Sequence, residues 1–364
     1  MRVLITGNLG YVGTILTQHL RRIFPEAELI GFDIGYFAQN LTGAGRFPEV
    51  NLNAQVFGDI RSFPEKLLEG TDAILNLAAI SNDPIGNRFA EVTMEVNYRA
   101  AERLAGLAKK YGVKHFVFAS SCSIYGAASD SPKLESDNLN PLTAYARSKV
   151  EAERALETLA DESFIVTCLR FATACGFSQR LRLDLVLNDF VAAALMNGEI
   201  SILSDGTPWR PLINVRDMAR AFEWALGRGL REGGAFLAVN TGSNDWNIQV
   251  RELAEAVASQ FDGVRISVNP KAERDKRSYR VNFDLFHELA PAHIPVHDLV
   301  STIRELRDGL RDMGFADDEF RQSRLIRLNE LNRLLAMGAL DESLQWDPAF
   351  RKQDGTRTLS PVHQ

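Results

Sequence analysis

Tyr145 and Lys149 are the residues of this chain whose types and spacing could do the most specific chemistry. They stand four positions apart in NPLTAYARSKVEAER, so a helix would place both on one face. A phenol near its reference pKa of about 10 is a poor base at neutral pH, but an adjacent ammonium group stabilises the phenolate. The pair therefore predicts a base that can take a proton from an alcohol.

A glycine-rich loop at the start of the chain predicts a partner for that base. TGNLGYVG lies between an apolar run at Arg2–Thr6 and a segment of helical periodicity at Tyr11–Phe24. The first glycine permits a tight turn, the second lets backbone approach a diphosphate, and the third lets helix and strand pack closely. The helix N-terminus would then face phosphates with free N–H groups. The predicted dinucleotide site comprises Gly7, Asn8, Leu9, Gly10, Tyr11, Val12 and Gly13, with an ordinary glycine-rich turn as the alternative.

Asp33 ends a second apolar run, Glu28–Asp33, twenty residues after Gly13. A carboxylate there can accept both ribose hydroxyls of NAD and would repel a 2′-phosphate, so NAD is favoured over NADP. A capping or turn aspartate is the alternative. Asp59 and Ile60 follow a third run and are predicted near the adenine. The oxidised nicotinamide ring would add its positive charge to that of the lysine beside the phenol.

Hydroxyl side chains appear where a further strand is predicted to end, in FASSCSIYG. Ser121 or Ser123 could bind the substrate oxygen and hold it against Tyr145. The alternative is that such serines satisfy backbone groups at a strand end. We favour this second role for Ser120, which is also counted among the residues beside the cofactor.

Short apolar runs alternate with helical segments over the first half of the chain. The runs are Arg2–Thr6, Glu28–Asp33, Gln55–Asp59, Ala73–Leu77, His115–Ser120 and Phe164–Arg170, and the helical segments include Phe89–Tyr111 and Ala144–Ala160. This pattern predicts an α/β fold, a Rossmann-type doubly wound parallel sheet over residues 1–175, with a return segment near 213–241. Residues 176–315 are expected to form a smaller mixed α/β substrate lobe, and residues 316–364 a helical extension.

Within those later parts, individual elements are also predicted. Helices are expected at Leu181–Asn197, Asp217–Gly227, Asn247–Gln260, Val300–Gly314 and Leu325–Leu344, and strands at Ile200–Leu203 and Arg265–Val268.

Composition narrows the class of protein. The 364-residue chain carries a net charge of −6, which gives no basic footprint for nucleic acid. Its three cysteines form no CxxC pair and its six histidines have no metal-ligand spacing, so neither a disulfide framework nor a metal is expected. We find no signal peptide and no apolar stretch of about 18 residues, the length of a membrane span. A cytoplasmic protein without a membrane partner is predicted.

Several of these motifs occur together, in order, in one known family. TGNLGYVG, Asp33, GDI (58–60), NLAA (76–79), Asn97, SSCSIYG, YARSK, LRFATACG, SDGTPWRPLINVRD and VSTIRELRDGL stand over residues 1–310. On these motifs the chain resembles the extended short-chain dehydrogenase/reductases of the nucleotide-sugar epimerase/dehydratase family. The resemblance implies NAD as cofactor and adds Leu77, Ala78, Ala79 and Asn97 to the residues expected around it.

The resemblance also implies catalytic roles. Tyr145 matches the family's base, Lys149 its helper, and Ser121, four residues before Tyr125, its catalytic serine or threonine. Family dehydratases usually carry Asp-Glu at the next two positions, where this chain has Cys122 and Ser123. Neither is a competent acid or base for eliminating water, which argues against 4,6-dehydration.

Residues for the substrate are implied by the same resemblance. The family binds a nucleotide diphosphate through arginines, of which Arg210 in SDGTPWRP is one, while Arg274 or Arg277, with Arg277 preferred, is expected to be the second. An exposed surface charge is the alternative for each. Further substrate contacts are expected at Ser81, Asn82, Ser123, Thr173, Arg180, Arg182 and Asn188. Thr173 stands where many members have asparagine, which puts that sugar-nucleotide contact in doubt.

The function predicted from these residues is an NAD-dependent epimerase acting on a nucleotide-diphosphate sugar through a transient keto intermediate. The cofactor would be regenerated in place, which suits tightly held NAD. One alternative is a nucleotide-sugar dehydrogenase or ketoreductase with net redox change, and another is a non-catalytic NAD-binding regulator. The resemblance further implies a homodimer through helices near 89–111 and 144–160.

Overall fold

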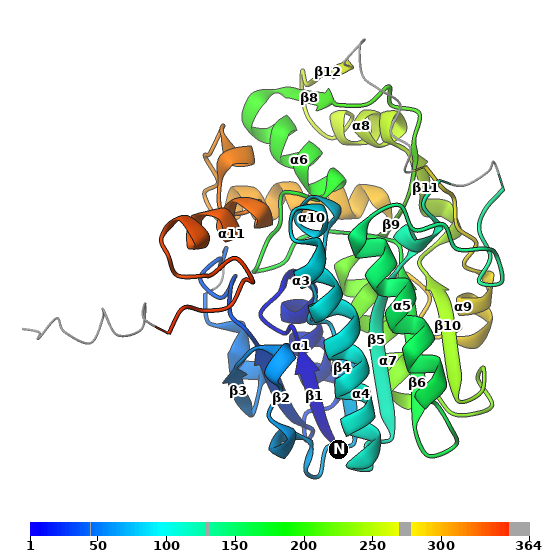
Figure 1. Ribbon diagram of the computed structural model, residues 1–364. Coiled ribbons are helices and arrows are strands. Elements are labelled where there is room, and N and C mark those ends of the chain that lie inside the picture. Colours follow the sequence, from blue (N-terminus) through cyan, green and yellow to red (C-terminus); the bar gives the residue numbers. More distant parts are fainter. Residues whose placement is uncertain (44, 128–130, 269–277, 349–364) are drawn as a thin grey trace, which may run out of the picture.

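The centre of the molecule is a seven-stranded parallel sheet (Figure 1). The computed structural model describes residues 1–43, 45–127, 131–268 and 278–348. The strand order of the seven-stranded sheet is β10-β6-β5-β4-β1-β2-β3. The strands are β1 (Arg2–Thr6), β2 (Glu28–Asp33), β3 (Ala54–Phe57), β4 (Ala73–Asn76), β5 (His115–Ser121), β6 (Ile165–Phe171) and β10 (Phe236–Thr241). The predicted Rossmann-type sheet is confirmed, and a strand from the return segment completes it.

Helices cover both faces of this sheet, because each strand buries side chains on both sides. Val3 and Ile5 of β1 pack with α1 (Tyr11–Ile23) and α7 (Val215–Gly227). Leu4 packs on the opposite face with α4 (Ala100–Lys110) and α5 (Ala144–Leu159). Such two-sided burial explains why the strands are nearly continuous apolar runs. In the described part of the chain, no helix is both long and apolar enough to cross a membrane.

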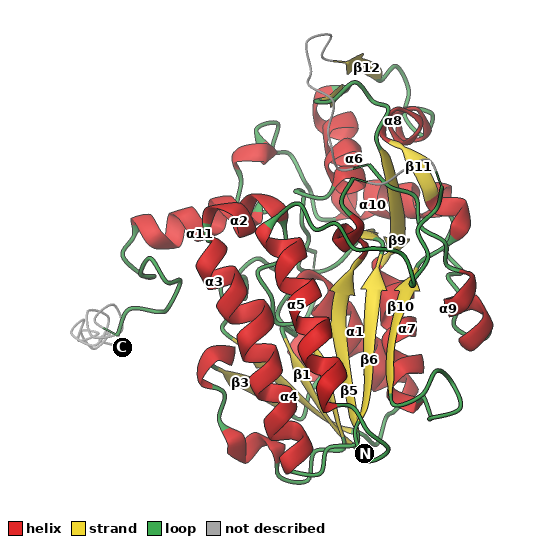
Figure 2. Cartoon of the chain, turned by 45° about the vertical axis from the view of Figure 1, so that its right-hand side comes forward, coloured by secondary structure: helices red, strands yellow, loops and turns green. Residues whose placement is uncertain are grey.

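A smaller lobe lies beyond the carboxyl ends of the sheet strands (Figure 2). In it β7 (Thr173–Cys175), β9 (Trp209–Asn214) and β11 (Asn247–Gln249) form a three-stranded sheet, and β8 (Glu199–Ile202) pairs with β12 (Arg265–Val268). The helices around them are α6 (Val186–Asn197), α8 (Val250–Ala258), α9 (Asp284–Leu289) and α10 (Leu299–Asp312). The short helices α2 (Asp83–Arg88) and α3 (Ala90–Met94) follow β4, and α11 (Arg327–Ala336) lies near the carboxyl end.

Two helices predicted for this lobe begin later than expected. The helix predicted at Leu181–Asn197 starts at Val186, because the preceding backbone bonds outward, with Leu183 N donating to Leu325 O at 3.0 Å. The helix predicted at Asn247–Gln260 starts at Val250. Gln249 and Glu252 form a capping box at that point, and the three residues before it pair with β9 as a strand instead.

Two other predicted helices are interrupted or shortened. The segment predicted at Phe89–Tyr111 contains a π-helical turn, η4 (Glu95–Arg99), between α3 and α4. The helix predicted at Leu325–Leu344 is limited to α11, after which Gly338 adopts φ +67° and turns the chain. A glycine in this left-handed conformation is a common helix end.

Backbone segments pack closely at the turn between β1 and α1. Gly7 has φ +75°, and a Cβ atom built on it would lie 2.6 Å from Ala78 N. A Cβ on Gly13 would lie 2.5 Å from both Asn8 Cα and Gly7 O. The glycines thus bring the start of α1 against the turn and the turn against the end of β4.

We expect Gly13→Ala to lower the free energy of unfolding by about 1–3 kcal/mol, because the added methyl meets backbone that cannot move aside. Gly106→Ala is the matched control, since Gly106 lies inside α4 with nothing within 4 Å of its added Cβ. That change should be neutral or stabilising by up to about 1 kcal/mol. Urea unfolding of both variants measures the difference, and equal stability would contradict the packing argument.

Candidate active site

One cavity of about 940 Å³ lies between the carboxyl ends of the strands and the smaller lobe. It collects most of the residues that the sequence singled out. Those lining it are Gly7, Gly10, Tyr11, Val12, Gly13, Asp33, Asp59, Ile60, Leu77, Ala78, Ala79, Ser81, Asn82, Ser120, Ser121, Ser123, Tyr145, Lys149, Thr173 and Arg210. Such a volume is at the upper end of the range for small-molecule sites.

Ser121, Tyr145 and Lys149 meet in this cavity. Ser121 ends β5 and hydrogen-bonds the Tyr145 side chain from α5. One turn further along α5, Lys149 Nζ donates to Ala119 O at 2.7 Å and lies 5.7 Å from the centre of the Tyr145 ring. The three groups therefore stand together, as the spacing along the helix predicts.

The electrostatics of this trio differ from the prediction made from sequence. Burial raises the pKa of Tyr145 to about 12, and the hydrogen bond from Ser121 acts against that rise. Burial also lowers the pKa of Lys149 to about 7, although the nearby charge of Glu153 opposes it. The expected lowering of the Tyr145 pKa is thus not found in the protein itself: burial of the phenol dominates, and Ser121 and Arg182 are the groups that oppose the rise.

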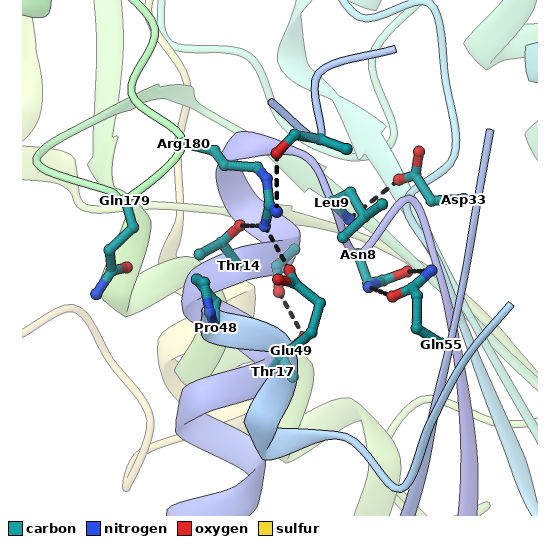
Figure 3. A network of polar contacts seen from close by, with 12 residues as sticks. Asn8, Leu9, Thr14, Thr17, Asp33, Pro48, Glu49, Gln55, Gln179 and Arg180 are labelled. Carbon is teal, nitrogen blue, oxygen red and sulfur yellow. Dashed lines mark hydrogen bonds and ion pairs between the residues drawn. The ribbon is translucent and has the colours of Figure 1, made fainter. Parts of the chain in front are cut away.

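The other end of the cavity has the features of a dinucleotide site. Helix α1 begins after Gly10 with no side-chain cap and no acidic residue in its first turn, so its N–H groups and dipole suit an anion. Asp33 accepts a hydrogen bond from Leu9 N at 3.0 Å (Figure 3) and another from Gly35 N at 2.7 Å. Burial raises the pKa of Asp33, and these two N–H donors oppose the rise. A diphosphate at α1 and a ribose diol at Asp33 fit these groups.

Three residues predicted beside the cofactor, Asn8, Leu9 and Asn97, do not line the cavity but lie behind the residues that do. Asn8 Nδ2 donates to Gln55 Oε1 at 2.5 Å, beneath the turn (Figure 3). The Leu9 side chain is buried, and only its backbone N–H reaches Asp33. Asn97, in the π-helical turn, accepts from Ile80 N at 2.8 Å and donates to Ile80 O at 3.0 Å. The contacts of Asn97 hold the loop after β4 in place, while those of Asn8 and Leu9 join the glycine turn to β3 and β2. Direct contact of these three residues with the cofactor stays a prediction.

Two residues predicted at the substrate also lie outside the cavity lining. The Arg180 guanidinium pairs with Glu49 at 2.6 Å and donates to Thr14 Oγ1 at 3.2 Å, on the far side of α1 (Figure 3). Asn188 accepts from Gly176 N at 3.1 Å and donates to Arg182 O at 2.9 Å. Neither side chain lines the cavity, and the contacts described for both are to the fold. The binding of phosphate or ribose by these two residues stays a prediction. Arg277 lies outside the described residues.

Arg182 is the arginine of that stretch that reaches the cavity. It pairs with Asp184 at 2.9 Å and donates to Ser81 Oγ at 3.0 Å, while Asn82 Nδ2 donates to Asp184 at 2.7 Å. Burial alone would raise the pKa of Asp184, but Arg182 outweighs it and holds that pKa below its usual range. This network links the loop after β4 to the smaller lobe.

The two positions after Ser121 have different surroundings. Ser123 Oγ lines the cavity and is buried without a hydrogen-bond partner among the described residues, so it is available to a ligand. Cys122 Sγ donates to Arg170 O at 3.0 Å and does not line the cavity. Burial raises the pKa of the Cys122 thiol, which leaves it unsuited to proton transfer.

Sequence reasoning missed several residues that line the cavity. They are Tyr36, Phe37, Thr143, Tyr279, Arg321, Ile326 and Arg327. Three of them come from the carboxyl-terminal segment. The alternation of arginine and leucine there indicated a helix, but no local pattern indicates which of its side chains line a cavity.

A buried ion pair supports the floor of the site. Glu153 of α5 accepts from the Arg170 guanidinium, with 2.7 Å between Oε2 and Nη2, and both side chains are under one-tenth exposed. Ser120 donates to the same carboxylate, and Arg170 Nη1 donates to Tyr125 OH at 3.1 Å. Ser120 is therefore held by the ion pair, although it also lines the cavity.

Comparisons with known proteins agree with this site. The model of the NAD dependent epimerase/dehydratase family matches residues 3–240. A Bacillus subtilis protein described as an uncharacterized UDP-glucose epimerase is 29% identical over 241 residues, which are 63% of this chain and 73% of that protein. The dTDP-D-glucose 4,6-dehydratase of Mus musculus is 26% identical over 259 residues, or 70% of this chain and 71% of that enzyme.

A solved structure shares the fold. MoeE5, solved in complex with UDP-glucose and NAD, has a TM-score of 0.71 and 24% sequence identity, and the match covers 85% of this chain and 99% of that one. Relatives of this chain include both epimerases and dehydratases, so the family and its NAD cofactor are shown, and the reaction is not.

We expect Glu153→Gln to lower the free energy of unfolding by about 3–5 kcal/mol, because it leaves the Arg170 guanidinium buried without a counter-charge. Glu151→Gln is the matched control two residues away on α5. Glu151 also pairs with an arginine, Arg154 at 2.8 Å, but both side chains are largely exposed, so the change should stay within about 0.5 kcal/mol. Urea unfolding compares the two, and a similar cost for both would show that burial does not set the strength of the pair.

Proposed function

Because the chain belongs to the NAD-dependent epimerase/dehydratase family, we propose that it is an NAD-dependent epimerase of a nucleotide-diphosphate sugar. The observation that carries the proposal is the meeting of Ser121, Tyr145 and Lys149 in the cavity that also contains the glycine turn. The sugar reacts through a transient keto intermediate and leaves with one carbinol centre inverted.

Each member of the trio has a distinct task in this proposal. Bound NAD supplies the hydride acceptor and donor, and its positive ring adds the charge that stabilises a phenolate. Tyr145 Oη takes the proton of the sugar hydroxyl and later returns it. The Ser121 hydroxyl holds the sugar oxygen against Tyr145, and Lys149, with its Nζ beside the phenol ring, supports the phenolate.

The remaining lining suits a polar, anionic substrate. Ser123 offers an unpartnered hydroxyl among the described residues, and Thr173 stands beside the glycine-containing turn after β7. Arg210 and Arg182 bring guanidinium groups to the same cavity, and such groups match phosphate oxygens in geometry and charge. These residues are proposed to hold the nucleotide diphosphate and the sugar.

Epimerisation is favoured over 4,6-dehydration by the surroundings of Cys122 and Ser123. Elimination of water needs an acid and a base beside the sugar, where relatives of that type carry two carboxylates. Here one position is a thiol bonded to Arg170 O and turned from the cavity, and the other is a hydroxyl. The same chain could still oxidise or reduce a sugar with net consumption of cofactor, so cofactor stoichiometry separates these reactions.

The first prediction of the proposal concerns products. Incubated with UDP-, dTDP-, GDP- and CDP-sugars, the purified protein should convert at least one to its epimer without adding or losing NADH over many turnovers. Chromatography of the sugars and absorbance of NADH measure this. Net accumulation of NADH with a keto product would indicate a dehydrogenase, and loss of water from the sugar would indicate a dehydratase.

The second prediction concerns the base. Tyr145→Phe should lower kcat by about 100-fold or more, because proton transfer contributes that much in comparable enzymes, while NAD affinity stays unchanged. Tyr111→Phe is the control, since Tyr111 lies at the surface and bonds Glu65 at 3.3 Å. An unchanged rate in the Tyr145 variant would show that Tyr145 is not the base, whereas NAD binding without turnover by the parent chain would support a non-catalytic NAD-binding protein.

Two features of assembly belong to the same proposal. We expect a homodimer through α4 and α5, as the resemblance implies, which light scattering on the purified chain measures. We also divide the chain into an NAD-binding part (1–175), a substrate lobe (176–315) and an extension (316–364), with the segment that contains β10 returning to the first part.

A further inference from the structure

The carboxyl-terminal segment, residues 316–348, lies against the β2 and β3 side of the molecule (Figure 1). It forms a separate apolar cluster there with the loops after β2 and β4 and with α2. The buried members of this cluster are Tyr36, Ile80, Ile85, Leu331, Leu334, Ala339, Leu340 and Leu344. The segment is therefore packed as part of the body beside the dinucleotide end of the cavity.

Polar contacts tie the same segment to the two loops that border the adenosine side of the site. Trp346 Nε1 donates to Ile34 O at 2.7 Å, directly after Asp33. Tyr36 OH donates to Leu344 O, and Arg61 Nη1 donates to Ser343 O at 2.7 Å. The carboxyl-terminal segment thus holds the loops after β2 and β3 where they line the cavity.

Arg327, the first residue of α11, extends from this segment into the cavity lining. It is 2% exposed, its guanidinium carbon lies 4.2 Å from the centre of the Phe37 ring, and its Nη2 donates to Arg180 O at 3.0 Å. Its Nη1 is buried with no hydrogen-bond partner among the described residues. The side chain is well ordered by its neighbours, yet one of its donors points to no protein acceptor.

The charges around Arg327 do not neutralise it. Arg182 is paired with Asp184 and Arg180 with Glu49, whereas no ion pair joins Arg327 to any residue that the structure describes. Burial lowers the pKa of Arg327 to about 9, and the positive charges of Arg182 and Arg180 act in the same direction; the carboxylates of Asp184 and Asp33 oppose the fall without reversing it. A buried cation without a counter-charge is costly, and a bound anion would remove that cost.

The position of Arg327 identifies the anion. Its hydrogen bond to Arg180 O attaches it to the segment that contacts Thr14 in α1, the helix whose uncapped N-terminus faces the cavity. Its other neighbours, Phe37 and the loop after Asp33, lie on the adenosine side. We propose that Arg327 binds the diphosphate of bound NAD, so that the carboxyl-terminal segment supplies a cation to the dinucleotide site.

This inference depends on NAD binding and not on which reaction the trio catalyses. If the sugar panel showed a different reaction, the measurements below would be unaffected, because they follow binding of the cofactor and its fragments.

The test compares Arg327→Gln with Arg333→Gln, the same change on the same helix. Arg333 is partly exposed and pairs with Glu330, which keeps Arg324 as a second partner. Calorimetric titration of the stripped full-length protein should show NAD and ADP-ribose binding weakened roughly 10- to 100-fold by Arg327→Gln, as expected for loss of a charged hydrogen bond. Adenosine, which lacks the diphosphate, should bind equally to both variants and the parent, and Arg333→Gln should change nothing.

Two further measurements separate this role from others. Without cofactor, the thermal unfolding temperature of Arg327→Gln should equal that of the parent or lie slightly above it, since the change removes an unpaired buried cation. A clearly lower unfolding temperature together with weaker adenosine binding would indicate a purely structural role and overturn the proposal. UDP affinity should be unchanged. If UDP binding fell while ADP-ribose binding held, Arg327 would belong to the substrate, and the proposal would be wrong.

Discussion

Backbone packing where the turn after β1 meets the end of β4 is the constraint on which the site depends. Gly7 approaches Ala78 so closely that no side chain fits, and Gly13 does the same with the turn itself. Strands β1 and β4 are neighbours in the sheet, yet the chain leaves β1 toward β2 and reaches β4 only after β3. A crevice opens at such a switch in strand order, and the glycines let α1 present its N-terminus to it.

Several buried cations of this molecule form ion pairs, such as Arg170–Glu153, Arg182–Asp184 and Arg180–Glu49. Among the described residues, the buried Lys149, Arg228 and Arg327 form none. Arg228 lies away from the cavity and donates to Thr167 Oγ1 and to backbone oxygens, whereas Lys149 and Arg327 line the cavity, and Arg327 keeps a donor without an acceptor. Burying a charge without a partner costs free energy that a stable fold tends to avoid. Exceptions of this kind are expected where ligands supply the missing charge.

The structure also shows which kinds of prediction succeeded. The six strands predicted over residues 2–170 were located to within about two residues, because most of them are buried on both faces and form continuous apolar runs. The strands at Thr173–Cys175, Trp209–Asn214 and Asn247–Gln249 were not predicted. The pair Tyr145 and Lys149 shares one face of α5 as helical spacing requires. Arg180 and Arg182 could not be told apart in this way. Their positions depend on remote partners, because Arg180 pairs with Glu49, 131 residues away, and Arg182 donates to Ser81, 101 residues away.

Spacing along the chain was thus enough to determine the alternation of strands and helices, the glycine turn, the acidic residue at the end of β2 and the phenol–ammonium pair, since each depends on residues close in sequence. Tertiary structure alone decided which arginine lines the cavity, that Ser123 keeps an unpartnered hydroxyl among the described residues, that burial raises the pKa of Tyr145, and that Arg327 reaches the cavity from the carboxyl-terminal segment. These features depend on burial and on partners supplied by segments more than a hundred residues away, as when Arg327 bonds Arg180 O, and no local pattern records them.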